Sequence, residues 1–133
     1  MSTPKKNGGF SLIEVLGATA LVAILMTVAL VSVVPILAEG KANTTQAFVD
    51  KAADQVQAYY MANDSYPADL SALEDAGYIE RIPNDPYGNA YVYATPAVYT
   101  TSIGFDLYSS GPDGTAQTSD DIGAGNYDHS VTP

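Results

Sequence analysis

Cysteine is absent from this chain, and cations are scarce: five lysines and arginines stand against fifteen aspartates and glutamates. Without cysteine, a domain exported from the cytoplasm has to be stabilised by packing or by a metal ion rather than by disulfides. The formal net charge of −10 argues against nucleic acid as a partner. One histidine, no cluster of cysteine and histidine, no phosphate-binding glycine motif and no nucleophile elbow together predict that the chain is not an enzyme.

Charge is also missing from one long internal segment. No charged residue occurs from Val15 to Leu37, a run of 23 positions. At about 1.5 Å per residue, a helix of this length crosses a hydrocarbon core about 30 Å thick. Lys5 and Lys6 precede the run, and the positive-inside rule therefore keeps the short N-terminus in the cytoplasm and exports the rest. Residues 38–133 hold three basic and fourteen acidic residues, which predicts a solvated, strongly acidic domain.

The residues before the apolar run have an unusual order. A secretory signal places its small-residue cleavage site after the apolar stretch, whereas Gly8-Gly9 lies before it. The stretch Gly8-Gly9-Phe10-Ser11-Leu12-Ile13-Glu14 resembles the leader of the type IV pilin and pseudopilin superfamily. The resemblance implies that a prepilin peptidase cuts after Gly9 and methylates the new N-terminus on Phe10. The alternative is a generic signal anchor.

Glu14 is the one acidic residue at the start of the apolar segment. A carboxylate in or near the bilayer core costs several kcal/mol unless it is paired, and such residues are usually functional. The nearest cation after cleavage is the α-amino group of Phe10, and in the resembling family this pair forms with the neighbouring subunit. We hypothesise that Glu14 sets the axial register of a polymer in this way. The alternative is that Glu14 reaches the lipid headgroups alone.

The apolar periodicity continues past the membrane segment and predicts an α+β, pilin-like fold. Apolar residues recur every three or four positions from Phe48 to Tyr60, so one helix is expected from Phe10 to about Ala62. Gly17 and Pro35 are expected to kink or break its first half. A short helix over residues 70–76, capped by Asp69, should follow. Alternation over 91–93 and 103–108, with 98–101 as a possible extension, predicts a small antiparallel sheet packed on the helix.

Acidic residues gather near the C-terminus, in Tyr108-Ser109-Ser110-Gly111-Pro112-Asp113-Gly114 and in Asp120-Asp121-Ile122-Gly123. Calcium binds six to eight oxygens from carboxylates, carbonyls and water, whereas the same residues could also form a solvated acidic turn. The order of residues resembles the calcium loop of the major pseudopilin family of type II secretion. That resemblance implies side-chain ligands from Asp113, Asp120 and Asp121, with the carbonyl of Ser110 in addition. The absence of cysteine points away from pilins that close this region with a disulfide.

These features together predict a structural subunit with three parts: a leader (1–9), a transmembrane and filament-core helix (10–37) and a periplasmic head (38–133). By resemblance, the chain forms a helical homopolymer that drives protein export by type II secretion. The implied partners are prepilin peptidase, an inner-membrane platform protein, a cytoplasmic ATPase and minor pseudopilins. Two alternatives remain: a type IV pilin for adhesion, motility or DNA uptake, and a monomeric, membrane-tethered calcium-binding domain.

Overall fold

The structure is a computed structural model that describes residues 8–131, without the side chains of residues 29–33. Lys5, Lys6 and most of the predicted leader therefore lie outside the described residues. The chain divides into two compact units, residues 1–38 and residues 39–133. One helix, α1 (Leu12–Asn63), contributes to both units.

Helix α1 confirms the long helix that the periodicity predicts. Its first turn forms where the Ser11 carbonyl accepts the N–H groups of Glu14 and Val15, at 3.0 and 3.1 Å. The helix continues through Gly17 and Pro35 over 52 residues, so a break at these positions is wrong, whereas a kink stays a prediction. A proline removes one backbone hydrogen bond, and the many remaining bonds of so long a helix keep it continuous.

Large apolar side chains of the first unit are exposed. Their exposed fractions run from 49% for Val15 to 83% for Phe10. Among the residues that the structure describes, no helix combines the length and the apolar character needed to cross a membrane. The predicted span, 10–37, includes the five side chains that lie outside the description.

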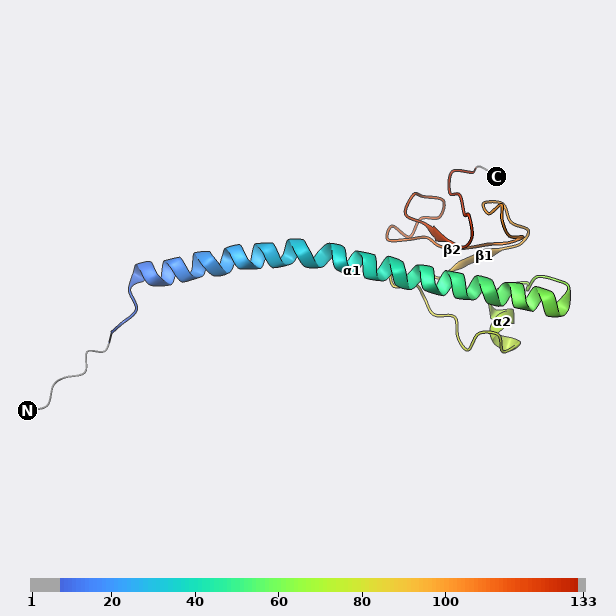
Figure 1. Ribbon diagram of the computed structural model, residues 1–133, viewed down its shortest axis with the longest axis horizontal. Helices are drawn as coiled ribbons and strands as arrows, with labels where there is room; N and C mark the ends of the chain where they lie inside the picture. The colour runs from blue at the N-terminus through green and yellow to red at the C-terminus, as the bar shows by residue number, and fades with distance from the viewer. Residues whose placement is uncertain (1–7, 132–133) are drawn as a thin grey trace, which may run out of the picture. The chain divides into compact units, whose positions relative to one another are not determined.

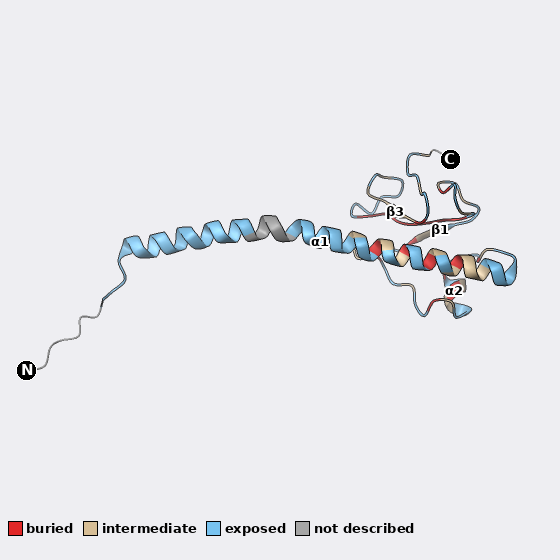
Figure 2. Ribbon diagram, viewed as in Figure 1, coloured by how far each residue is buried: buried red, intermediate tan, exposed pale blue. Residues whose placement is uncertain are grey.

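The second unit has a core between the latter part of α1, a short helix and a sheet. Figure 1 shows this part of α1 between α2 (Ser71–Asp75) and the strands, and Figure 2 shows its buried positions on α1. Val49, Ala52 and Val56 are at most 1% exposed, as the amphipathic spacing predicts. The following residues from other elements complete the core: Leu70, Leu73, Ile79, Tyr91, Phe105, Leu107 and Ala124.

Helix α2 confirms the predicted short helix but is one residue shorter at each end. The Asp69 carboxylate accepts the Ala72 N–H at 3.0 Å and the Ser71 hydroxyl at 2.6 Å, so it satisfies a backbone donor that the first turn leaves free. Its hydrogen bonds hold the pKa of Asp69 below its usual value, with the Ser71 hydroxyl as the largest cause. Gly77 follows the helix with a φ of +78°, a left-handed conformation that glycine adopts without steric cost.

Three short antiparallel strands form the sheet, in the order β1-β2-β3. They are β1 (Val92–Ala94), β2 (Asp106–Ser109) and β3 (Ile122–Gly123). The predicted strands are displaced: 91–93 moves by one residue, and 103–108 begins only at Asp106, because Gly104 lies against the Tyr66 ring and its carbonyl accepts the Ala97 N–H. Strand β3 is absent from the prediction. It pairs Ile122 and Gly123 with the end of β2.

The predicted strand extension over 98–101 is wrong, and a buried carboxylate explains why. Asp106 is 1% exposed and accepts the N–H groups of Val98, Tyr99 and Thr100 at 2.7 to 3.2 Å. These three donors would otherwise serve a strand ladder. The segment therefore wraps around the side chain, and only Thr100 makes an isolated bridge, to Tyr127.

Replacing Asp106 with asparagine is expected to destabilise the second unit by about 3 kcal/mol. The amide group would turn an N–H donor toward buried backbone donors and would lose the charge that strengthens these bonds. Urea unfolding of the full chain in detergent measures the change. The control is Asp128→Asn, because the Asp128 carboxylate accepts hydrogen bonds from Ser130 in an exposed turn. Equal stability of the two variants would show that Asp106 does not organise residues 98–100.

Candidate functional site

The acidic loop, residues 110–121, connects β2 to β3. The antiparallel pairing of Tyr108 with Gly123 and of Ser109 with Ile122 brings the two ends of the loop together. Ser110, at its start, is 6% exposed, whereas Asp113 is exposed and Asp120 and Asp121 are partly buried. The sheet thus fixes the two ends of a loop whose acidic side chains reach the surface.

The three predicted aspartates face one common atom, the hydroxyl oxygen of Thr118. Oδ1 of Asp120 lies 2.5 Å from it, and the Oδ1 atoms of Asp113 and Asp121 each lie 3.5 Å from it. The Asp113 N–H also donates to Asp120 Oδ2 at 3.1 Å. The structure therefore brings together three carboxylates that are separated by up to eight positions in the sequence.

Hydrogen bonds within the loop stabilise the charged form of the central carboxylate. The Thr118 hydroxyl, followed by the Asp113 N–H, holds the pKa of Asp120 below its usual value. Asp121 accepts the Gln117 N–H at 2.7 Å and the Tyr127 hydroxyl at 2.8 Å. Burial, followed by the bond to Asp121, raises the pKa of Tyr127. Asp120 is thus ionised at neutral pH, and Tyr127 keeps the proton that it donates to Asp121.

The donor chemistry of the loop fits calcium, which binds oxygen ligands in flexible geometry. Three carboxylates converge, and the loop carbonyls, including that of Ser110, can supply further oxygens. Within residues 8–131, however, no three histidine, cysteine, aspartate or glutamate side chains are grouped closely enough to hold a metal ion as they stand. The aspartates instead bond to Thr118 and to backbone N–H groups. Rotation of these side chains from Thr118 toward a shared centre would be needed for binding.

Sequence reasoning missed several residues that support the loop. Thr118 is the shared contact of the three carboxylates, and Asn89 donates its side-chain amide to the Gly111 carbonyl at 3.1 Å. Tyr127 stacks on Tyr108 with ring centroids 4.6 Å apart. The dense turn at 83–89 is visible in the sequence, but its contact with residues 22 positions later has no local signal.

The predicted processing and assembly residues lie at the start of the described chain. Gly9 and Phe10 are exposed and precede α1, and Glu14 lies in the first turn of that helix. The helix begins at Leu12 rather than at Phe10 as predicted, so only part of the segment between Phe10 and Glu14 is helical. The pairing of Glu14 with the amine of a neighbouring subunit stays a prediction.

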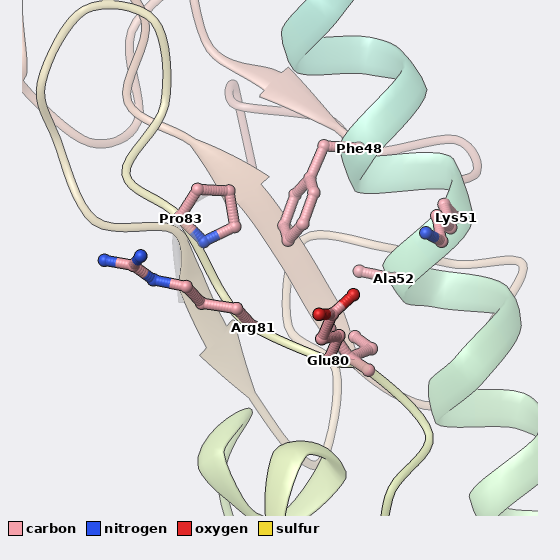
Figure 3. A pocket seen from close by; sticks show the side chains of 7 residues that line it. Phe48, Lys51, Ala52, Glu80, Arg81 and Pro83 are labelled. Atoms are coloured by element: carbon pink, nitrogen blue, oxygen red, sulfur yellow. The ribbon is translucent and has the colours of Figure 1, made fainter.

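A separate hollow of about 260 Å³ lies between α1 and the segment after α2 (Figure 3). Phe48, Ala52 and Pro83 form apolar parts of its wall, and Glu80 lies between Lys51 and Arg81. The lining contains no histidine, serine, threonine or cysteine.

Comparisons with known proteins cover nearly the whole chain. The family described as "Type II secretion system (T2SS), protein G" matches residues 32–125, and the "Prokaryotic N-terminal methylation motif" matches residues 4–30. Type II secretion system core protein G of Escherichia coli K12 is 32% identical over 92% of this chain and 93% of its own length. The same protein of Pseudomonas aeruginosa is 29% identical over 94% of this chain and 98% of its own length.

One solved structure has a similar fold. The crystal structure of the major pseudopilin from the type 2 secretion system of enterohaemorrhagic Escherichia coli matches with a TM-score of 0.59 and 27% identity. The match covers 68% of this chain and 87% of that chain. It agrees with the α+β fold described above, in which a long N-terminal helix packs on a small antiparallel sheet.

Proposed function

This chain belongs to the type II secretion system protein G family, and we propose that it is the repeating structural subunit of a pseudopilus that drives protein export. The observation that carries the proposal is the joint match of the methylation motif over 4–30 and of the family over 32–125. Leader, apolar helix and head thus occur in the order that such a subunit needs. The chain acts by polymerising and has no catalytic role.

The exposed apolar side chains of the first unit support a place in a membrane and, after extraction, in a filament core. Leaving such groups in water is unfavourable by about 25 cal/mol per Å² of apolar surface. Lipid covers them before assembly, and the helices of neighbouring subunits cover them afterwards. Lys5 and Lys6 orient the subunit in the inner membrane with its N-terminus in the cytoplasm and its head in the periplasm.

A crosslinking experiment tests polymerisation directly. Formaldehyde treatment of membranes that contain the full, processed chain is expected to give a ladder of multimers. The control is the same membrane treated after it has been dissolved in detergent, which separates subunits. Monomers alone in intact membranes would support the tethered monomeric domain instead.

Prepilin peptidase is the proposed processing partner, and it cuts between Gly9 and Phe10. Gly9→Val is expected to leave the precursor uncut. The peptidase accepts glycine before the cut, and the branched side chain of valine would not fit at that position. Intact-mass measurement of membrane-extracted chains gives the result. The unsubstituted chain should lose residues 1–9 and gain one methyl group. Gly8→Ala serves as the control and should be processed in the same way. Normal trimming of the Gly9→Val chain would place the cut elsewhere.

Calcium is the proposed ion of the 110–121 loop. Asp113, Asp120 and Asp121 would supply side-chain oxygens and Ser110 its backbone carbonyl. The convergence of the three carboxylates on Thr118 supports this assignment. When bound, the ion would neutralise the repulsion among these carboxylates and stabilise the fold of a head without disulfides.

The platform protein, the ATPase and minor pseudopilins are further proposed partners that add or cap subunits.

A further inference from the structure

We propose that Asn89 is a positioning residue for the acidic loop, because it fixes the loop backbone at Gly111 from outside the proposed ligand set. The proposal rests on the proposed calcium site and extends it to a different part of the chain. Asn89 lies in the turn before β1, 22 positions from the loop residue that it contacts.

Both backbone polar groups of Gly111 are hydrogen-bonded: the carbonyl to Asn89 in the turn before β1, and the N–H to Ser109 on β2. The Asn89 side-chain amide donates to the Gly111 carbonyl at 3.1 Å. The Gly111 N–H donates at 3.1 Å to the hydroxyl of Ser109, which is fully buried. Ser109 in turn donates to the Asp85 carboxylate at 2.5 Å. Gly111 is therefore fixed on two sides by residues that do not belong to the acidic loop.

The turn itself is well ordered by its own hydrogen bonds. Asp85 is 4% exposed, and its Oδ1 accepts the N–H groups of Tyr87 and Asn89 at 3.0 and 2.7 Å. The Asp85 N–H donates to the Asn89 carbonyl at 2.8 Å. The Tyr87 ring also contacts α1, because Lys41 Nζ lies 5.4 Å from the ring centroid. Asn89 thus projects from a support that is anchored to the helix.

The position of Gly111 determines the position of a predicted ligand. A Cβ atom at Gly111 would lie 2.3 Å from the Asp120 carbonyl oxygen and 2.7 Å from Asp120 Oδ2, so the backbones approach as closely as glycine permits. A Cβ atom at Gly114 would lie 3.2 Å from Asn89 Oδ1. Asn89 therefore lies beside both glycines that flank Asp113. A shift of Gly111 would displace Asp120 or open the loop.

Such support affects ion affinity without direct contact with the ion. If the loop is already folded, binding does not have to order it. The conformational entropy cost of binding is then smaller, and the affinity for the ion is higher. Loss of an outer-shell partner typically weakens metal binding 10- to 100-fold. Asn89→Ala is therefore expected to weaken calcium binding by about tenfold or more.

Asn89→Asp gives the sharper test, because positioning and electrostatics predict opposite results. This variant keeps the shape of the side chain but replaces the donor to the Gly111 carbonyl with an acceptor. Added negative charge near the loop would strengthen calcium binding by Coulomb attraction alone. The positioning role predicts weaker binding in spite of that charge.

Calorimetric calcium titration of the full chain in detergent, with calcium chloride as the probe, measures these affinities. The control is Asn84→Ala, because Asn84 belongs to the same turn but donates to Gly88 within it, at 3.2 Å. Thermal unfolding in excess chelator shows whether each variant is folded before the titration. Asn89→Ala and Asn89→Asp should bind at least about tenfold more weakly than Asn84→Ala.

Two outcomes would overturn the proposal, and they are distinguishable. If the unsubstituted chain binds calcium and Asn89→Asp binds it equally or more tightly, the positioning role is wrong and the calcium site stands. If the unsubstituted chain binds no calcium, the proposed ion is wrong and the positioning role fails with it.

Discussion

Replacing Glu14 with alanine is expected to abolish multimer formation while membrane insertion and cleavage continue. An unpaired carboxylate near the bilayer core costs about 3 kcal/mol on insertion scales, and pairing with a neighbour's amine recovers much of that cost. A free energy of this size corresponds to roughly a hundredfold in an association constant. Alanine removes the cost of placing a charge in the membrane, so insertion improves. It also removes the carboxylate that pairs with the neighbour's amine, so assembly fails. Crosslinking in intact membranes measures the multimer fraction.

Two variants separate this role from a general effect of charge. Glu39→Ala removes an acid of the same helix beyond the apolar run and should assemble normally. Glu14→Gln keeps the size and polarity but has no charge to offset the amine, and it should fail as alanine does. A normal ladder of multimers from cleaved Glu14→Ala chains would rule out the register role and leave the headgroup alternative.

Removal of calcium is expected to lower the thermal midpoint of the full chain in detergent by roughly 10 to 20 °C. If only the folded state binds the ion, an ion concentration of one hundred times the dissociation constant adds about 2.7 kcal/mol to the free energy of unfolding. For a domain of the size of residues 39–133, each kcal/mol shifts the midpoint by about 4 to 8 °C. The ten tyrosines, all within that unit, provide the fluorescence signal.

Asp120→Ala should remove the difference between calcium and chelator, because Asp120 is the carboxylate closest to Thr118. Asp75→Ala, which deletes an exposed acid at the end of α2, should keep the full difference. If the unsubstituted chain melts at the same temperature in millimolar calcium and in chelator, the loop is a solvated acidic turn.

The helices could be predicted from the sequence because their signals are local and repeated. The apolar spacing from Phe48 to Tyr60 predicts α1, which ends at Asn63, and Asp69 and Gly77 mark the two ends of α2. Pro35 shows the limit of a single-residue signal. One missing hydrogen bond does not outweigh the many bonds of the surrounding helix.

The strands were harder to predict because their boundaries depend on distant residues. Asp106 takes the backbone donors of 98–100, and Tyr66 and Ala97 contact Gly104, so alternation alone misplaces two strands. Strand β3 is only two residues long, too short for any periodic signal.

The acidic residues of the loop were predictable, but their support was not. Asp113, Asp120 and Asp121 were identified by residue type and by resemblance to a family, and the structure places them around Thr118. Asn89 contacts the loop residue Gly111 across 22 positions of sequence, and Asp85 contacts Ser109, at the end of β2, across 24. Such contacts arise from the folded sheet and its turn, and nothing in either segment alone indicates the other.

Deletion of the gene, followed by an inventory of proteins in the culture medium, tests the central claim most directly. A set of exported proteins should disappear from the medium and collect in the periplasm. The unsubstituted gene should restore them, whereas a gene carrying Glu14→Ala should not. An unchanged inventory, with surface fibres lost instead, would contradict a role in protein export and favour a type IV pilin.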